Sequence, residues 1–127
     1  MPSLGLTQPK NSIQVIRGTS KAFELVVSDE TGAIVNITGS RIIMTVKREL
    51  TDADPIIQKD SAVGPVEVEL SEPKAGKAKI YLDPPDTQTL DVREYVFDVW
   101  VILASGKRYA VVPPSVMEIV AGVTVIT

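Results

Sequence analysis

Short runs in which apolar and polar residues alternate recur along the chain, and turn-forming residues separate them. In the clearest run, Val66, Val68 and Leu70 share one face of an extended strand and alternate with two glutamates. Turn signals follow about every 8 to 12 residues, which predicts an all-β chain, an antiparallel β-sandwich of about eight or nine short strands. Besides 66–70, strands are expected at 13–17, 21–27, 33–35, 42–47, 56–58, 77–82, 94–104, 107–117 and in the final run 116–127.

One short helical turn is expected near 86–90, where Asp86 would serve as the helix N-cap. In immunoglobulin-like sandwiches, a tyrosine after such a turn lies near the start of strand F, two residues before a core cysteine. Tyr95 and Phe97 take these two places, so an immunoglobulin-like sandwich is expected. The alternation then directs these side chains into the core: Tyr95, Phe97, Val99, Val101 and Leu103.

The remaining positions of this strand would face outward, and Val96, Trp100 and Ile102 among them are apolar. A solvated sheet face would be polar, and an exposed tryptophan is typical of a protein interface. The alternative is that a loop or the N-terminal residues cover Trp100. Residues 123–127 are a second candidate contact. They include no charged residue that would disfavour pairing with a strand of another chain. The predicted interface residues are Val96, Trp100, Ile102, Val123 and Val125.

The composition of the chain argues against several classes of function. The 127 residues include no cysteine and no histidine, which excludes thiol catalysis, Ser-His-Asp triads and histidine-ligated metals. A net charge of −3 argues against nucleic-acid binding. Apolar runs of about five residues are too short to cross a membrane, and residues 1–10 lack a signal-peptide pattern. We expect an extended N-terminal arm at 1–11, where Pro2 and Pro9 lie, and a single domain at 12–127.

Several polar residues suggest a site, but each has a simpler structural explanation. Glu67 and Glu69 would lie about 7 Å apart on one strand face, within reach of the inverting-glycosidase separation, but a solvated face explains them better. Asp83 and Asp86 would hold a cation less readily than they would cap and turn the chain. Lys77, on a lysine-rich strand, suggests protection of a sheet edge. No catalytic residue, cofactor or metal is predicted.

Several segments together resemble phage and prophage tail proteins, in particular the N-terminal immunoglobulin-like domain of phage baseplate upper proteins. The order and spacing of the segments carry the resemblance more than any single one, and it spans roughly 15–125. The segments are RGT at 17–19, DETG at 29–32, ITG at 37–39, LDPPDTQTL at 82–90, YVFDV at 95–99, SGK at 105–107 and VTV at 123–125.

This resemblance implies a non-catalytic structural or assembly protein of a phage tail or baseplate, which bridges virion components by protein–protein contacts. The partners would be other tail or baseplate proteins and further copies of the chain, with no nucleic acid or membrane bound. The implied location is the virion tail, assembled in the bacterial cytoplasm. The alternative is a carbohydrate-binding or adhesion module on the same fold, which would need several aromatic residues on one face.

Overall fold

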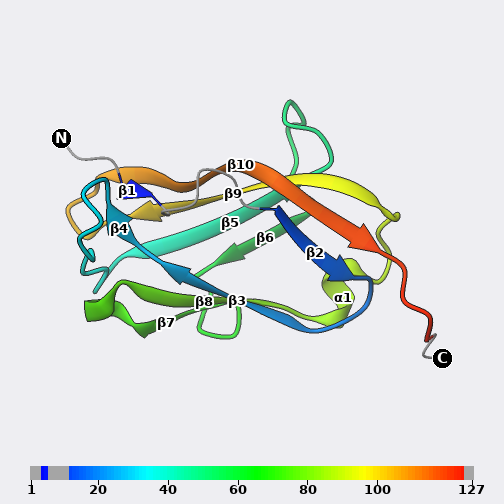
Figure 1. Cartoon of the computed structure of the whole chain (residues 1–127), viewed down its shortest axis with the longest axis horizontal. Helices are drawn as coiled ribbons and strands as arrows, with labels where there is room; N and C mark the ends of the chain where they lie inside the picture. The colour runs from blue at the N-terminus through cyan, green and yellow to red at the C-terminus, as the bar shows by residue number, and fades with distance from the viewer. Residues whose placement is uncertain (1–3, 6–11, 125–127) are drawn as a thin grey trace.

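The computed structural model of the chain describes residues 4–5 and 12–124 (Figure 1). A single helical turn, α1 (Pro84–Thr87), interrupts an otherwise all-β chain, as expected. A short 3-10 turn, η1 (Pro73–Ala75), which was not predicted, is also present. The strands of the described part are β1 (Leu4–Gly5), β2 (Ser12–Ile16), β3 (Lys21–Val26), β4 (Ser28–Asp29), β5 (Arg41–Lys47), β6 (Ile57–Asp60), β7 (Val68–Glu72), β8 (Lys77–Leu82), β9 (Arg93–Ile102) and β10 (Arg108–Val120).

Two main sheets form the sandwich. One has the order β2-β10-β9-β5-β6 and the other β3-β8-β7, while β1 and β4 form a small separate pair. Figure 1 shows the three-stranded sheet beneath the five-stranded one, with α1 at one end. In chain order, β3, β5, β6, β7, β8, β9 and β10 take the places of strands B, C, C′, D, E, F and G. The sheets G-F-C-C′ and B-E-D are those of a variable-type immunoglobulin sandwich, so the fold prediction is confirmed.

One strand pair runs against the antiparallel expectation. β2 pairs with β10 in parallel, with Ile13 opposite Met117 and Val15 opposite Ile119. Most of the chain separates these two strands in sequence, so no hairpin turn imposes an antiparallel direction on them. Side chains alternate between the two faces in the same way in parallel and antiparallel strands, so the sequence pattern could not distinguish the two kinds of pairing.

The core lies between the two sheets. On β9, Tyr95, Phe97, Val99 and Val101 are buried as expected, while Leu103 lies beyond the end of the strand and is half-buried. β8 contributes Ala78, Ile80 and Leu82 from the facing sheet. The inward placement of Val66 is wrong, because this residue is exposed and β7 begins only at Val68. The cause is a tight turn in which the N–H groups of Glu67 and Val68 both donate to the carbonyl of Gly64.

The tyrosine corner is present. The Tyr95 hydroxyl donates a hydrogen bond of 2.8 Å to the carbonyl of Asp91, four residues upstream. The preceding helical turn overlaps the predicted one but begins earlier, and the assignment of Asp86 as N-cap is wrong. Asp83 is the N-cap, and its N–H donates to the Asp86 carboxylate at 2.7 Å. The prolines at 84 and 85 explain the shift, since the first helical turn needs no N–H donors.

Three further expectations differ from the structure. Residues 33–35 form no strand, and Ile34 makes only an isolated bridge to Ser28. The strand expected at 107–117 is longer, because β10 passes through Pro113 and Pro114 with two register shifts and continues to Val120. The final run is therefore not a separate strand: residues 121–124 lie outside any strand, and 125–127 lie outside the described residues.

The lysine-rich strand β8 is central in its sheet, so the edge-protection interpretation of Lys77 and its neighbours is wrong. Lys79 instead lies between Glu24 on β3 and Glu69 on β7, where opposite charges on adjacent strands attract one another. Of the helices in the described residues, none is long and apolar enough to cross a membrane.

Candidate functional site

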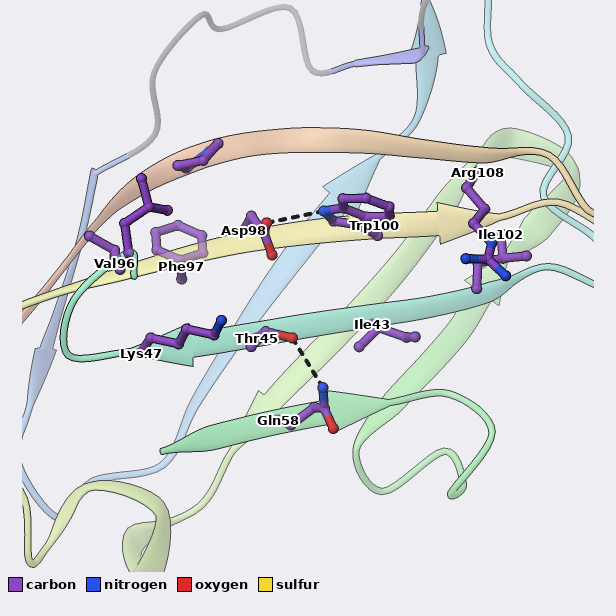
Figure 2. Close-up of a pocket in the computed structure, with 12 residues that line it drawn as sticks. Ile43, Thr45, Lys47, Gln58, Val96, Phe97, Asp98, Trp100, Ile102 and Arg108 are labelled. Atoms are coloured by element: carbon purple, nitrogen blue, oxygen red, sulfur yellow. Dashed lines mark hydrogen bonds between the residues drawn. The ribbon is translucent and has the colours of Figure 1, made fainter. Parts of the chain in front are cut away.

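The outer face of the five-stranded sheet carries a shallow hollow of about 340 Å³. Its exposed lining comes from β5, β6, β9, β10 and the loop after β5, and Figure 2 shows these side chains on one face. We call this surface the Trp100 face. It consists of Ile43, Thr45, Lys47, Leu50, Gln58, Val96, Asp98, Trp100, Ile102, Arg108 and Pro114.

Trp100 lies at the centre of this face. Strand pairing places Ile43 of β5 on one side of it and Ala110 of β10 on the other. The indole N–H donates a hydrogen bond of 3.0 Å to the carboxylate of Asp98, which precedes it on the same side of β9 (Figure 2). Although the indole N–H is already hydrogen-bonded, 42% of the surface of Trp100 is exposed to solvent. Trp100 is therefore an oriented aromatic surface that a partner can cover.

Neighbouring rows of side chains follow from the strand register. Ile102 lies between Arg41 and Arg108, and Val96 lies between Lys47 and Val116. On the opposite side of Trp100 from Ile102, Asp98 lies next to Thr45, whose hydroxyl accepts a hydrogen bond of 3.2 Å from Gln58. The Trp100 face thus combines an apolar group, formed by Ile43, Trp100 and Ile102, with Asp98 on one side of the indole and Arg108 beside Ile102.

The cations on and beside this face differ in whether they already form an ion pair within the chain. Arg41 donates two hydrogen bonds to Asp60, and this contact raises the pKa of Arg41 and lowers the pKa of Asp60 against the effect of desolvation. The ion pairs found among the described residues include neither Arg108 nor Lys47. These two cations are consequently available to a partner's acidic groups.

The edge beside this face is protected against strand addition. Lys59 on the edge strand β6 points inward, is buried, and forms an ion pair of 2.8 Å with Asp86 of α1. An inward-pointing charge on an edge strand disfavours pairing with another chain. Binding at this side of the sandwich is therefore expected through the sheet face rather than through the β6 edge.

The structure brings three of the five predicted interface residues together. Val96 and Ile102 are half-buried and lie with Trp100 on one face. Val123 is fully exposed beyond the end of β10, where it lines a separate hollow with Ile16. Val125 lies outside the described residues.

The sequence prediction missed the members of this face that come from other strands. Ile43 is apolar in the outward phase of β5, and Arg108 lies opposite Ile102 on β10. The apolar residue at the outward position of 42–47 was a usable signal for Ile43. Arg108 had none, because only the pairing of β10 with β9 brings it there.

The carboxylates weighed as candidates have structural contacts. Glu67 accepts the N–H of Asp60 at 3.0 Å, while Glu69 accepts the hydroxyl of Tyr81 at 2.7 Å and so raises the pKa of that phenol. Asp86 forms an ion pair with Lys59 and accepts a hydrogen bond from the N–H of Asp83 at the start of α1. Within the described residues, no group of three or more acidic side chains is arranged to hold a metal ion.

No family model matches the sequence, and no curated protein matches it. Among solved structures, the chain is similar to murine CRIg, with a TM-score of 0.42 and 15% identity over 96% of this chain and 98% of that chain. The immunoglobulin-like assignment rests on the strand order and the tyrosine corner described above.

Proposed function

We propose that this chain is a non-catalytic protein-binding module whose contact surface is the Trp100 face. The observation that carries the proposal is the exposed Trp100 ring, which lies beside the apolar side chains of Ile43 and Ile102 on the same face. Binding energy in protein interfaces concentrates on such aromatic anchors, which lie near the centre of the contact with less important residues around them.

A more specific form of the proposal states the assembly to which the chain would belong. The chain would be a structural or assembly protein of a phage or prophage tail or baseplate, where it bridges other virion proteins. The support is the order and spacing of the sequence segments between residues 17 and 125 that resemble phage tail proteins. A sandwich with an oriented aromatic contact and a protected β6 edge suits such a bridging role.

A carbohydrate-binding role on the same face has less support. Stacking on sugars generally uses several aromatic rings, whereas Trp100 is the one outward-facing aromatic residue among the described lining of this face. Tyr95 and Phe97 are buried in the core, and Tyr81 lies on the other sheet with its hydroxyl bonded to Glu69. The single ring fits a protein side-chain contact better than an extended glycan platform.

Site-specific photo-crosslinking tests the proposal. A benzophenone amino acid is placed at position 43 of the full chain, next to Trp100, and at position 24 on the outer face of the other sheet as the matched control. In the organism or particle that naturally produces the chain, position 43 should crosslink to a protein, and Trp100→Ala should abolish the product. Position 24 should give no comparable product.

Two results would contradict the proposal. The first is equal crosslinking from both positions, or crosslinking from position 43 that persists in the Trp100→Ala variant. The second is binding to a glycan array that Trp100→Ala abolishes, which would favour the carbohydrate role. Far-UV circular dichroism of each variant ensures that loss of crosslinking does not reflect unfolding.

A further inference from the structure

We propose that the partner of the Trp100 face is a second copy of this chain. The two copies would pack face to face around a two-fold axis that crosses β9 at Trp100 and runs perpendicular to the strands. This inference rests on the proposed function, because it assigns an occupant to the same surface. The distribution of charge along β9 and β10 carries it.

The two relevant charges lie on opposite sides of Trp100 along the strand direction (Figure 2). Asp98 precedes Trp100 by two residues on β9, and Arg108 lies on β10 opposite Ile102, two residues beyond Trp100. Two residues of a strand span about 7 Å, so the acid and the base are about equally far from the tryptophan. Arg41, the other cation beside Ile102, is already held by Asp60.

A two-fold axis perpendicular to the strands exchanges these two sides. It places Asp98 of one copy over Ile102 of the other, and Arg108 is only one strand, about 4.8 Å, to the side. An arginine side chain can cover that distance, so two symmetry-related ion pairs would form around a central contact between the two Trp100 rings. Such an interface is isologous and closed.

The other simple arrangement is unfavourable. An axis parallel to the strands would keep the row of Asp98 facing its own copy and the row of Arg108 facing its own copy. Like charges would then oppose each other at both ends of the contact, which costs several kcal/mol in an interface. Charge complementarity therefore selects the perpendicular axis.

The area of the face is sufficient for a dimer. Four strands form the face, and β6, β5, β9 and β10 are 4, 7, 10 and 13 residues long. At about 4.8 Å between strands and about 3.4 Å per residue, the two copies together would cover on the order of 1,100 Å². A specific interface needs roughly 1,000 Å² or more in total, so this contact lies just above that limit.

Charge reversal tests the axis directly. Sedimentation velocity over a wide concentration range is compared for the wild-type chain, Asp98→Arg, Arg108→Asp and the double variant that carries both changes. Each single reversal should raise the dimer dissociation constant at least about 100-fold, since it opposes like charges twice. The double variant should recover to within about tenfold of the wild type. Glu30→Arg, in an exposed turn away from this face, is the control and should leave the dimer unchanged.

The possible failures are separable. A wild-type chain that stays monomeric at every concentration overturns the second-copy inference, and the proposed function survives if position 43 still crosslinks to a different protein. A dimer that neither reversal weakens, or that the double variant does not restore, overturns the axis and its charge pairing. Loss of crosslinking from position 43 in the presence of a dimer removes both the inference and the proposed function. Circular dichroism and thermal melting of each variant establish that the change acts on association.

Discussion

Replacing Tyr95 with phenylalanine removes one hydroxyl from the corner that joins the helical turn to β9. The ring stays in the core, where Tyr95 is 1% exposed, and the change deletes the hydrogen bond of 2.8 Å to the carbonyl of Asp91. A net hydrogen bond contributes about 1 kcal/mol, and a buried acceptor left without a donor costs about 1–3 kcal/mol. Asp91 itself is exposed, so water can partly replace the lost donor. We therefore expect the free energy of unfolding to fall by about 1.5 kcal/mol.

The expected change in melting temperature follows from the chain length. At about 2.1 cal/mol/K per residue, 127 residues give an unfolding entropy of about 0.27 kcal/mol/K, so Tm should fall by about 6 °C. Urea unfolding and thermal melting, both followed by far-UV circular dichroism, measure the two quantities.

Tyr81→Phe is the matched control. It removes a hydroxyl whose bond of 2.7 Å to Glu69 lies on the outer face of the other sheet, where water can replace it. Its expected cost is below about 0.5 kcal/mol. If Tyr95→Phe also stays within about 0.3 kcal/mol of the wild type, or matches Tyr81→Phe, the corner bond does not stabilise this fold.

Three more predictions concern single contacts. Asp86→Ala leaves the Lys59 ammonium buried without its partner and should cost about 3 kcal/mol in urea unfolding, whereas Lys59→Met should be nearly neutral; equal costs would contradict this. The pKa of Asp60 lies below its ordinary 3.8 because Arg41 donates to it, so the pair stabilises the fold above about pH 4 and the effect is lost as pH falls through the lowered pKa. The destabilisation by Arg41→Gln should accordingly be measurable at pH 7 and shrink towards pH 2. Gly76→Ala, at φ 70° with the new Cβ 2.7 Å from a backbone oxygen, should cost at least about 2 kcal/mol, and a Tm within 2 °C of wild type would refute the clash.

Local patterns were sufficient for most strands. The alternation in 94–104 identified the four buried residues of β9, and the Tyr95–Phe97 spacing identified the corner. Errors occurred where a turn changed the phase or the length of a strand. The turn at Gly64 removed Val66 from its strand, and β10 passes through the prolines at 113–114 with register shifts whose positions depend on its pairing with β9.

The candidate site was only partly predictable for a related reason. The outward phase of one strand is visible in its own sequence, which is why Val96, Trp100 and Ile102 could be named together. Ile43 and Arg108 join them through pairings with β9 whose register depends on every turn between the strands. The placement of the end of the chain, with Val123 exposed beyond β10, depended on where that strand stopped.

The sequence by itself determined the class of fold, the inward residues of β9, and the absence of cysteine and histidine chemistry, because each of these follows from composition or from spacing within a few residues. Only the tertiary structure decided the parallel pairing of β2, the burial of Lys59 against Asp86, and the arrangement of Asp98 and Arg108 around Trp100. These depend on contacts between segments far apart in the chain, and the energy of such contacts leaves no periodic signal in either segment alone.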